Sequence, residues 1–270
     1  MSNDDSYDSY NREEIYFCSH LFRLLHEGID SKEGALGMLL STLSSINSSP
    51  SGKTVKFSGL RFENIKIFCE AALLRDKYKR LLEKDKCNKI ELNVKKFMDD
   101  LVESLMKHYK INDDCRMYSE LKEKGLETSY PGRIIKKALE IDVDLTKKEN
   151  EKIIYEEIQK LFYSSPDLLI TIDDYLIVIE AKFTQPFSND QLERTRLLAE
   201  IWAELLYKDL GFRKPPDPKQ IVVYKLGKKY KHVDKHDRLT WENIYDIAYV
   251  IYEGNKNDRS LIAFERAKVY

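Results

Sequence analysis

The spacing of apolar positions changes partway along the chain. Over residues 13–128, apolar residues recur at intervals of three and four, as at Phe17, Leu21 and Leu24, which is the period of a helix with one buried face. Residues 1–12 are polar and without periodicity, so they are expected to form a flexible tail. The pattern therefore predicts an all-helical N-terminal region.

Proline and glycine in the segment SYPG, Ser129–Gly132, interrupt the helical pattern and mark the expected domain boundary. Residues 129–270 then alternate between helix and strand periods, which predicts an α/β domain. Thr146 and Glu149 have the spacing of a helix-capping pair, and Ser188 and Gln191 repeat it. The predicted strands are Leu168–Ile172, Tyr175–Ala181 and Ile221–Leu226. A helix is predicted at about Trp241–Tyr252, and a last short helix follows it.

The first two strands are joined only by Asp173 and Asp174, which predicts a tight hairpin. If these two acids form the turn, the numbers of paired residues sum to 347, and Asp167 lies directly across from Glu180. Side chains of opposed residues project from the same face of a sheet, with Cβ atoms about 4.5–5.5 Å apart. Lys182 shares that face with Glu180, because side chains alternate along a strand. The three groups are therefore expected to converge.

Two carboxylates held together at the end of an apolar hairpin repel one another. A divalent cation removes this repulsion, and Mg²⁺ in particular prefers carboxylate oxygen and leaves room for a substrate phosphate. Lys182 could then orient a metal-bound water or, as the neutral amine, deprotonate it, or its ammonium could neutralise charge on a phosphorane-like transition state. The alternative is that Asp167 only caps a strand while Glu180 and Lys182 form an exposed ion pair.

Pro166-Asp167, followed after a hairpin by Glu180-Ala181-Lys182 at the end of an apolar strand, resembles the signature of the PD-(D/E)XK nuclease superfamily. The resemblance covers about Leu145 to Tyr252. It implies a restriction-endonuclease-like fold, a mixed sheet flanked by helices. It also implies that Asp167, Glu180 and the backbone carbonyl of Ala181 ligate Mg²⁺, with Mn²⁺ as a substitute, and that Lys182 is the catalytic lysine.

The superfamily usually adds an acidic residue from the helix before the first motif strand. On the predicted helix that ends near Phe162, Glu151 and Glu157 lie on or at the edge of the apolar side, so both are candidates. The sequence departs from the family here, because the strand expected between this helix and Asp167 has almost no room.

Basic residues after the motif are candidates for nucleic-acid binding, because Arg and Lys suit phosphate oxygens. Two lie in the first turns of the helix after Ser188, and three lie in a basic loop after the strand at Ile221–Leu226. They are Arg194, Arg196, Lys228, Lys229 and Lys231. Solvated surface charge is the alternative for all five.

Composition narrows the class of protein only slightly. With 45 basic and 46 acidic residues the formal net charge is −1, so any basic surface has to be local. The four cysteines have no paired spacing, and the sequence has neither a signal-peptide pattern nor an apolar run long enough to span a membrane. We therefore expect reduced thiols and a cytoplasmic location.

Together these patterns predict a Mg²⁺-dependent nuclease that hydrolyses phosphodiester bonds, with DNA as the expected substrate and restriction, defence or repair as the setting. The helical region could bind substrate, a partner or a second copy of the chain in a homodimer. The alternative from another class is a nucleic-acid-binding or assembly protein that keeps the nuclease fold without catalysis.

Overall fold

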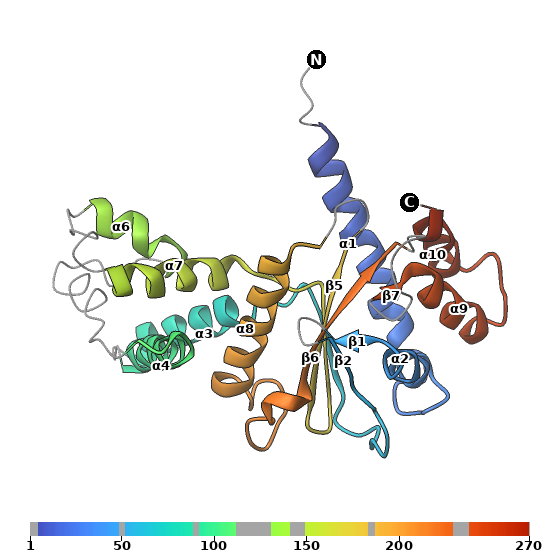
Figure 1. Cartoon of the computed structure of the whole chain (residues 1–270), viewed down its shortest axis with the longest axis horizontal. Helices are drawn as coiled ribbons and strands as arrows, with labels where there is room; N and C mark the ends of the chain where they lie inside the picture. The colour runs from blue at the N-terminus through green and yellow to red at the C-terminus, as the bar shows by residue number, and fades with distance from the viewer. Residues whose placement is uncertain are drawn as a thin grey trace. The chain divides into compact units, whose positions relative to one another are not determined.

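The computed structural model divides the chain into two compact units (Figure 1). Met1–Ala71 and Pro166–Tyr270 form the first, called the sheet unit, and Ala72–Ser165 form the second, called the helical unit. The predicted boundary at Ser129–Gly132 coincides with neither junction between them. The described residues are 5–48, 52–88, 92–111, 131–140, 149–182, 187–228 and 238–269.

A mixed five-stranded sheet, in the order β3-β4-β5-β6-β7, is the centre of the sheet unit. β3, β4 and β5 pair antiparallel, whereas β5, β6 and β7 pair parallel. The predicted α/β class is confirmed for the described residues. The strands are β3 (Lys66–Cys69), β4 (Leu168–Ile172), β5 (Tyr175–Ala181), β6 (Ile221–Gly227) and β7 (Leu239–Thr240).

The β4–β5 hairpin has the predicted register, from Ile172 opposite Tyr175 to Leu168 opposite Ile179. Asp173 opens the turn with φ of 48°, a left-handed conformation that Asp adopts more readily than most residues. Its carboxylate accepts a hydrogen bond of 2.8 Å from the backbone N–H of Arg61, which holds the turn. Because the turn has only two residues, it allows a single register, which extends along the hairpin to Asp167 and Glu180.

Both faces of the sheet are covered by helices, which explains why all five residues of β4 are buried (Figure 1). One face packs its Ile and Leu side chains against four helices in a single hydrophobic core. These helices are α1 (Asp5–Leu25), α2 (Ala35–Leu43), α9 (Trp241–Ile251) and α10 (Arg259–Val269). The other face is covered by α8 (Asn189–Leu205) and the segment after it, where the Thr171 hydroxyl donates to the Leu210 carbonyl at 3.1 Å.

Local capping signals set where the helices of the sheet unit begin. Ser188 caps α8, as predicted, by accepting a hydrogen bond of 3.1 Å from the Gln191 N–H. Thr240 and Asn243 form a reciprocal capping box at the start of α9. A short 3-10 helix, η3 (Pro218–Gln220), leads into β6. None of the described helices is long and apolar enough to cross a membrane.

The prediction that residues 13–128 are entirely helical is wrong, because β3 lies within them and pairs with β4. A second, two-stranded sheet of β1 (Asn47–Ser48) and β2 (Lys53–Thr54) also lies within residues 13–128. Both departures have one cause. These strands have only two to four residues, too few for an alternating pattern to stand out from the helical period around them.

The helical unit is inserted in the chain between β3 and β4. Asp85 of the first helix accepts hydrogen bonds from Asn93 and Val94 at the start of the second, which ties this pair together. Thr146, the predicted cap, lies outside the described residues. The unit consists of α3 (Leu73–Asn88), α4 (Leu92–Tyr109), the 3-10 helix η1 (Pro131–Arg133), α6 (Ile134–Glu140) and α7 (Glu149–Tyr163).

Candidate active site

Asp167 is held where β3, β4 and β5 meet. Its carbonyl accepts a hydrogen bond of 3.0 Å from the Glu70 N–H, which continues the β3–β4 pairing by one residue. Its side-chain Oδ2 accepts a hydrogen bond of 2.7 Å from the backbone N–H of Ala181. Backbone hydrogen bonds from both neighbouring strands therefore fix the position of Asp167, and they turn its carboxylate toward the end of β5.

Glu180 is buried beside it, with 6% of its surface exposed. Its Oε1 accepts a hydrogen bond of 2.7 Å from the Thr195 hydroxyl, and its Oε2 has a longer contact of 3.5 Å with Nε2 of Gln191. Both donors come from α8, which covers this face of the sheet. The burial of Glu180 contradicts the alternative in which this residue forms an exposed ion pair.

The two carboxyl groups interact directly. Burial, and then the negative charge of Asp167, raise the pKa of Glu180 to about 8, and a side-chain hydrogen bond between the two acids acts in the same direction. The hydrogen bond from Thr195 and the positive charge of Lys182 lower this pKa by less. Without a cation the pair therefore holds a proton near neutral pH, as expected for two carboxylates sharing a buried site.

Lys182 directly follows β5. Its backbone N–H donates a hydrogen bond of 2.8 Å to the carbonyl of Leu226, so the chain is still held beside β6 at this residue. The side chain is half-buried, and its charge is close enough to Glu180 to affect the pKa of that carboxyl. The structure thus brings together the three residues that the hairpin register predicted.

Two contacts of Glu180 were not predicted from the sequence. The capping role explains the backbone of Gln191, but its side chain points to Glu180 rather than to the helix start. Thr195 lies one turn further along α8 and is also buried. Residues four apart lie on the same helix face, so two polar residues at this spacing on the apolar side of α8 were the available signal.

Glu70 is a further acid next to the pair that the sequence did not single out. The β3–β4 register places it opposite Asp167, and it has a positive φ of 49°. Its side chain is exposed, whereas the Cys69 thiol beside it is half-buried. Burial, with the charges of Glu70 and Asp167, raises the pKa of that thiol to about 11, so Cys69 stays protonated near neutral pH.

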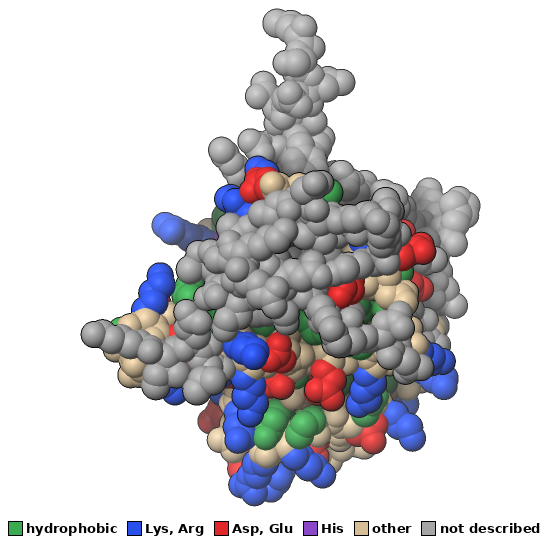
Figure 2. All heavy atoms as spheres, turned by 90° about the vertical axis from the view of Figure 1, so that its left-hand side faces the viewer, with side chains coloured by type: hydrophobic (Ala, Val, Ile, Leu, Met, Phe, Trp, Pro, Cys, Tyr) green, Lys and Arg blue, Asp and Glu red, His purple; other side chains and the backbone are tan. Residues whose placement is uncertain are grey.

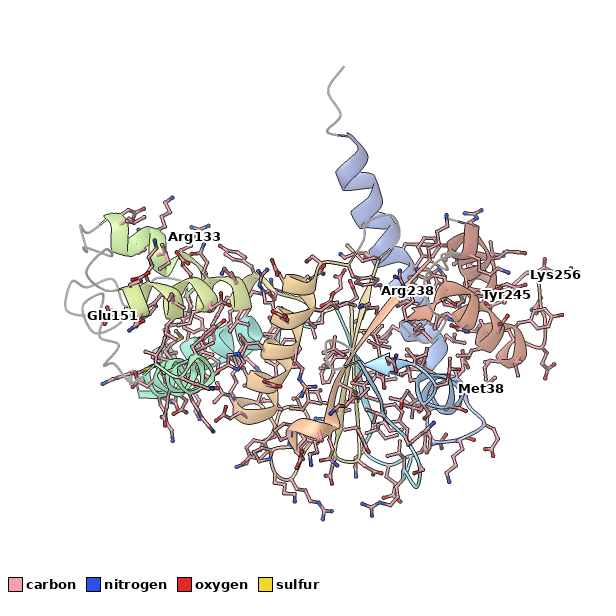
Figure 3. All side chains as sticks on the ribbon, in the orientation of Figure 1. Met38, Arg133, Glu151, Arg238, Tyr245 and Lys256 are labelled. Atoms are coloured by element: carbon pink, nitrogen blue, oxygen red, sulfur yellow. The ribbon has the colours of Figure 1, made fainter. Side chains whose placement is uncertain are left out.

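Glu151 lies on α7, in the helical unit (Figure 3), and so does Glu157, whereas Asp167 and Glu180 belong to the sheet unit. Glu157 pairs with Lys160 at 2.6 Å, and Glu151 is buried with 6% of its surface exposed. The role of either glutamate as a third acid stays a prediction. The strand beside β4 is β3, which comes earlier in the chain than α7. The helices that precede β3 in the chain are α1 and α2.

Arg196 has partners within the fold, and its predicted contact with phosphate stays a prediction. Its guanidinium donates to the carbonyls of Ile221 and Pro218 and to Glu200, so it holds the start of β6 against α8. Ile221 lies four residues before Lys225, the partner of Glu180, which is about 13 Å along a strand. Arg194 is half-buried, one turn from Gln191 on α8, and remains a candidate.

Of the basic loop, Lys228 is half-buried directly after β6, while Lys229 and Lys231 lie outside the described residues. At the far end of the loop, the Arg238 guanidinium lies over the ring of Phe187, 5.8 Å from its centroid (Figure 3). Elsewhere, Figure 2 shows Lys and Arg interspersed with acidic and apolar side chains on the described part of the face that it draws.

The donor set of the pair fits a hard divalent cation. Asp167 and Glu180 supply carboxylate oxygens, and their repulsion and shared proton show that the site favours added positive charge. Among the described residues no group of three or more His, Cys, Asp or Glu side chains gathers around one point. Two carboxylates with the Ala181 carbonyl suit Mg²⁺, which usually keeps several waters and few protein ligands.

Comparison with known proteins adds no assignment. The chain matches no protein-family model, no curated protein and no solved structure. Its function therefore has to be inferred from the geometry of the site itself.

Proposed function

We propose that the chain is a Mg²⁺-dependent nuclease that hydrolyses phosphodiester bonds in nucleic acid, with DNA as the substrate. The observation that carries the proposal is the buried Glu180, held by α8 against the carboxylate of Asp167, with Lys182 two residues away. Without a bound cation, such an acid pair destabilises the folded protein. A site that gathers two costly acids and a lysine at the end of a sheet is typical of catalysis.

In the proposed reaction the oxygen of water adds to phosphorus, the P–O ester bond breaks, and the leaving oxygen takes up a proton. A bound Mg²⁺ supplies Lewis-acid stabilisation of the phosphate and makes the attacking water more acidic. Asp167, Glu180 and the Ala181 carbonyl would hold this ion. Lys182 either orients and deprotonates the water, or its ammonium stabilises the negative charge that develops on phosphate oxygen.

The surroundings of the pair add groups that suit a nucleic-acid backbone. Arg194 on α8 and Lys228 after β6 both lie near the end of the sheet at which Glu180 and Lys182 are found. Arg238 extends this set across the sheet, because Arg238 and Lys182 both lie beside Gly227. The Nη1 of Arg238 is 3.7 Å, and the Lys182 carbonyl 3.5 Å, from the position that a Cβ atom on Gly227 would take. These cations would contact phosphates and so favour a polyanionic substrate.

The test is cleavage of supercoiled plasmid and of labelled single- and double-stranded oligonucleotides by the purified full chain. We expect cleavage with Mg²⁺ or Mn²⁺, and none with EDTA or with Ca²⁺ alone, because Ca²⁺ takes more ligands at longer distances and fits the reaction poorly. Parallel RNA substrates decide between the two nucleic acids.

Glu180→Ala and Lys182→Ala serve as the controls for contaminating nucleases, with circular dichroism to show that both variants fold. Equal cleavage by wild type and both variants would contradict the proposal. Binding of nucleic acid without metal and without cleavage would favour the alternative, a binding or assembly protein that keeps this fold.

A further inference from the structure

The two oxygens of Glu180 have different surroundings. Of the two donors on α8, the hydroxyl of Thr195 gives Oε1 a short hydrogen bond of 2.7 Å, whereas Nε2 of Gln191 has a longer contact of 3.5 Å with Oε2. Thr195 is itself buried, with 5% of its surface exposed, so water does not compete for its hydroxyl. α8 thus occupies one oxygen of this carboxylate and leaves the other more open.

We propose that Thr195 is a positioning residue, which holds Oε1 of Glu180 so that Oε2 is presented to the divalent cation. The inference rests on the proposed function, since it assigns a role within the same site. It concerns the binding of the cation, not the bond-breaking step, so it is measured without any nucleic acid present.

Physical reasons favour a threonine here. A glutamate has three rotatable side-chain bonds, and a ligand that has to be ordered at the moment of binding costs affinity. Thr195 is β-branched and lies within α8, so its side chain has few rotamers, and in the observed one its hydroxyl donates to Glu180.

A purely structural role for the Thr195 hydroxyl predicts something different. If the hydroxyl only satisfies a buried oxygen, its removal lowers thermal stability and leaves cation affinity unchanged. Thr171 provides a matched control, because it is also a buried threonine in the sheet unit and its hydroxyl donates to the carbonyl of Leu210 instead of to an acid.

The experiment measures Mn²⁺ affinity of the full chain by isothermal titration calorimetry and by the Mn²⁺-dependent rise in melting temperature. The variants are Thr195→Val, which keeps the shape and loses the donor, Thr195→Ser, which keeps the donor, and Thr171→Val. Thr195→Cys, a weak donor of similar size, replaces Thr195→Val if that variant does not fold. Cleavage rates at saturating Mn²⁺ are measured on the same samples.

We expect Thr195→Val to need at least about tenfold more Mn²⁺ for half-saturation, since partners that orient a metal ligand typically contribute about 10- to 100-fold in affinity. Thr195→Ser and Thr171→Val should bind Mn²⁺ like the wild type. Equal affinity of Thr195→Val and wild type, or an equal loss in Thr171→Val, would overturn the role of Thr195 while the nuclease proposal stands. A wild type that neither binds Mn²⁺ nor cleaves would overturn both.

Discussion

Lys182→Ala is expected to reduce the rate of cleavage by about 10³-fold while Mn²⁺ binds as in the wild type. The reason is that Lys182 lies beside the acid pair but is not a ligand of the proposed cation. Its backbone, not its side chain, makes the hydrogen bond to Leu226 that holds β5 beside β6. Single-turnover cleavage at saturating Mn²⁺ measures the first effect, and the Mn²⁺-dependent shift in melting temperature measures the second.

Lys182→Arg separates the two roles proposed for this lysine. Arginine keeps the positive charge but does not give up a proton in proteins. Partial recovery of cleavage would therefore assign Lys182 to charge stabilisation, and no recovery would assign it to proton transfer. Lys219→Ala, an exposed lysine at the start of β6, is the control and should cleave normally. Loss of Mn²⁺ binding together with cleavage in Lys182→Ala would contradict this account.

Glu180→Gln is expected to have effects of opposite sign on function and stability. Cleavage and Mn²⁺ binding should fall to background, because the amide lacks the charge that holds a cation. The metal-free variant should nevertheless be more stable than the wild type above neutral pH. The amide keeps an acceptor for the Thr195 hydroxyl, and it removes a negative charge that is buried beside Asp167.

The direction of the pH effect follows from the pKa of Glu180. Folding raises this pKa from 4.5 to about 8, so the stability that goes with the protonated form is complete below pH 4.5 and is lost as the pH rises through 8. Between pH 5 and 9, the free energy of unfolding of the metal-free wild type should fall relative to that of Glu180→Gln. The difference is on the order of 4 kcal/mol.

Urea unfolding in EDTA at several pH values measures this difference. Asp173→Asn is the matched control, because it removes an acid from the same hairpin at a turn that pairs with exposed Arg61. That variant should keep cleavage, and its stability should keep the pH dependence of the wild type, because it retains Glu180. A Glu180→Gln protein that is less stable than the wild type at both ends of the pH range would mean that the carboxyl group of Glu180 stabilises the fold.

The hairpin and its acid pair could be predicted because short-range rules set them. Two acids between two apolar runs leave one tight turn, and the turn fixes which residues face each other. The ends of β4 and β5 and the cap of α8 follow from equally local signals. The sequence could therefore predict that Asp167, Glu180 and Lys182 meet before any tertiary contact was known.

Other features depend on contacts between distant parts of the chain. β3 pairs with β4 across about a hundred residues, and nothing within its four residues reveals the partner. The contact of Thr195 with Glu180 depends on how α8 rotates over the sheet. The acceptors of Arg196 could not be predicted for the same reason, since they are carbonyls near the start of β6.

The most direct test of the central claim, that the hairpin register builds a cation site, is a crystal structure of the protein with Mn²⁺ and its anomalous difference map. We predict a peak between the carboxylates of Asp167 and Glu180, with ligand distances of about 2.0–2.3 Å and the Ala181 carbonyl nearby. A map without that peak, at a Mn²⁺ concentration that supports cleavage in solution, would contradict that claim.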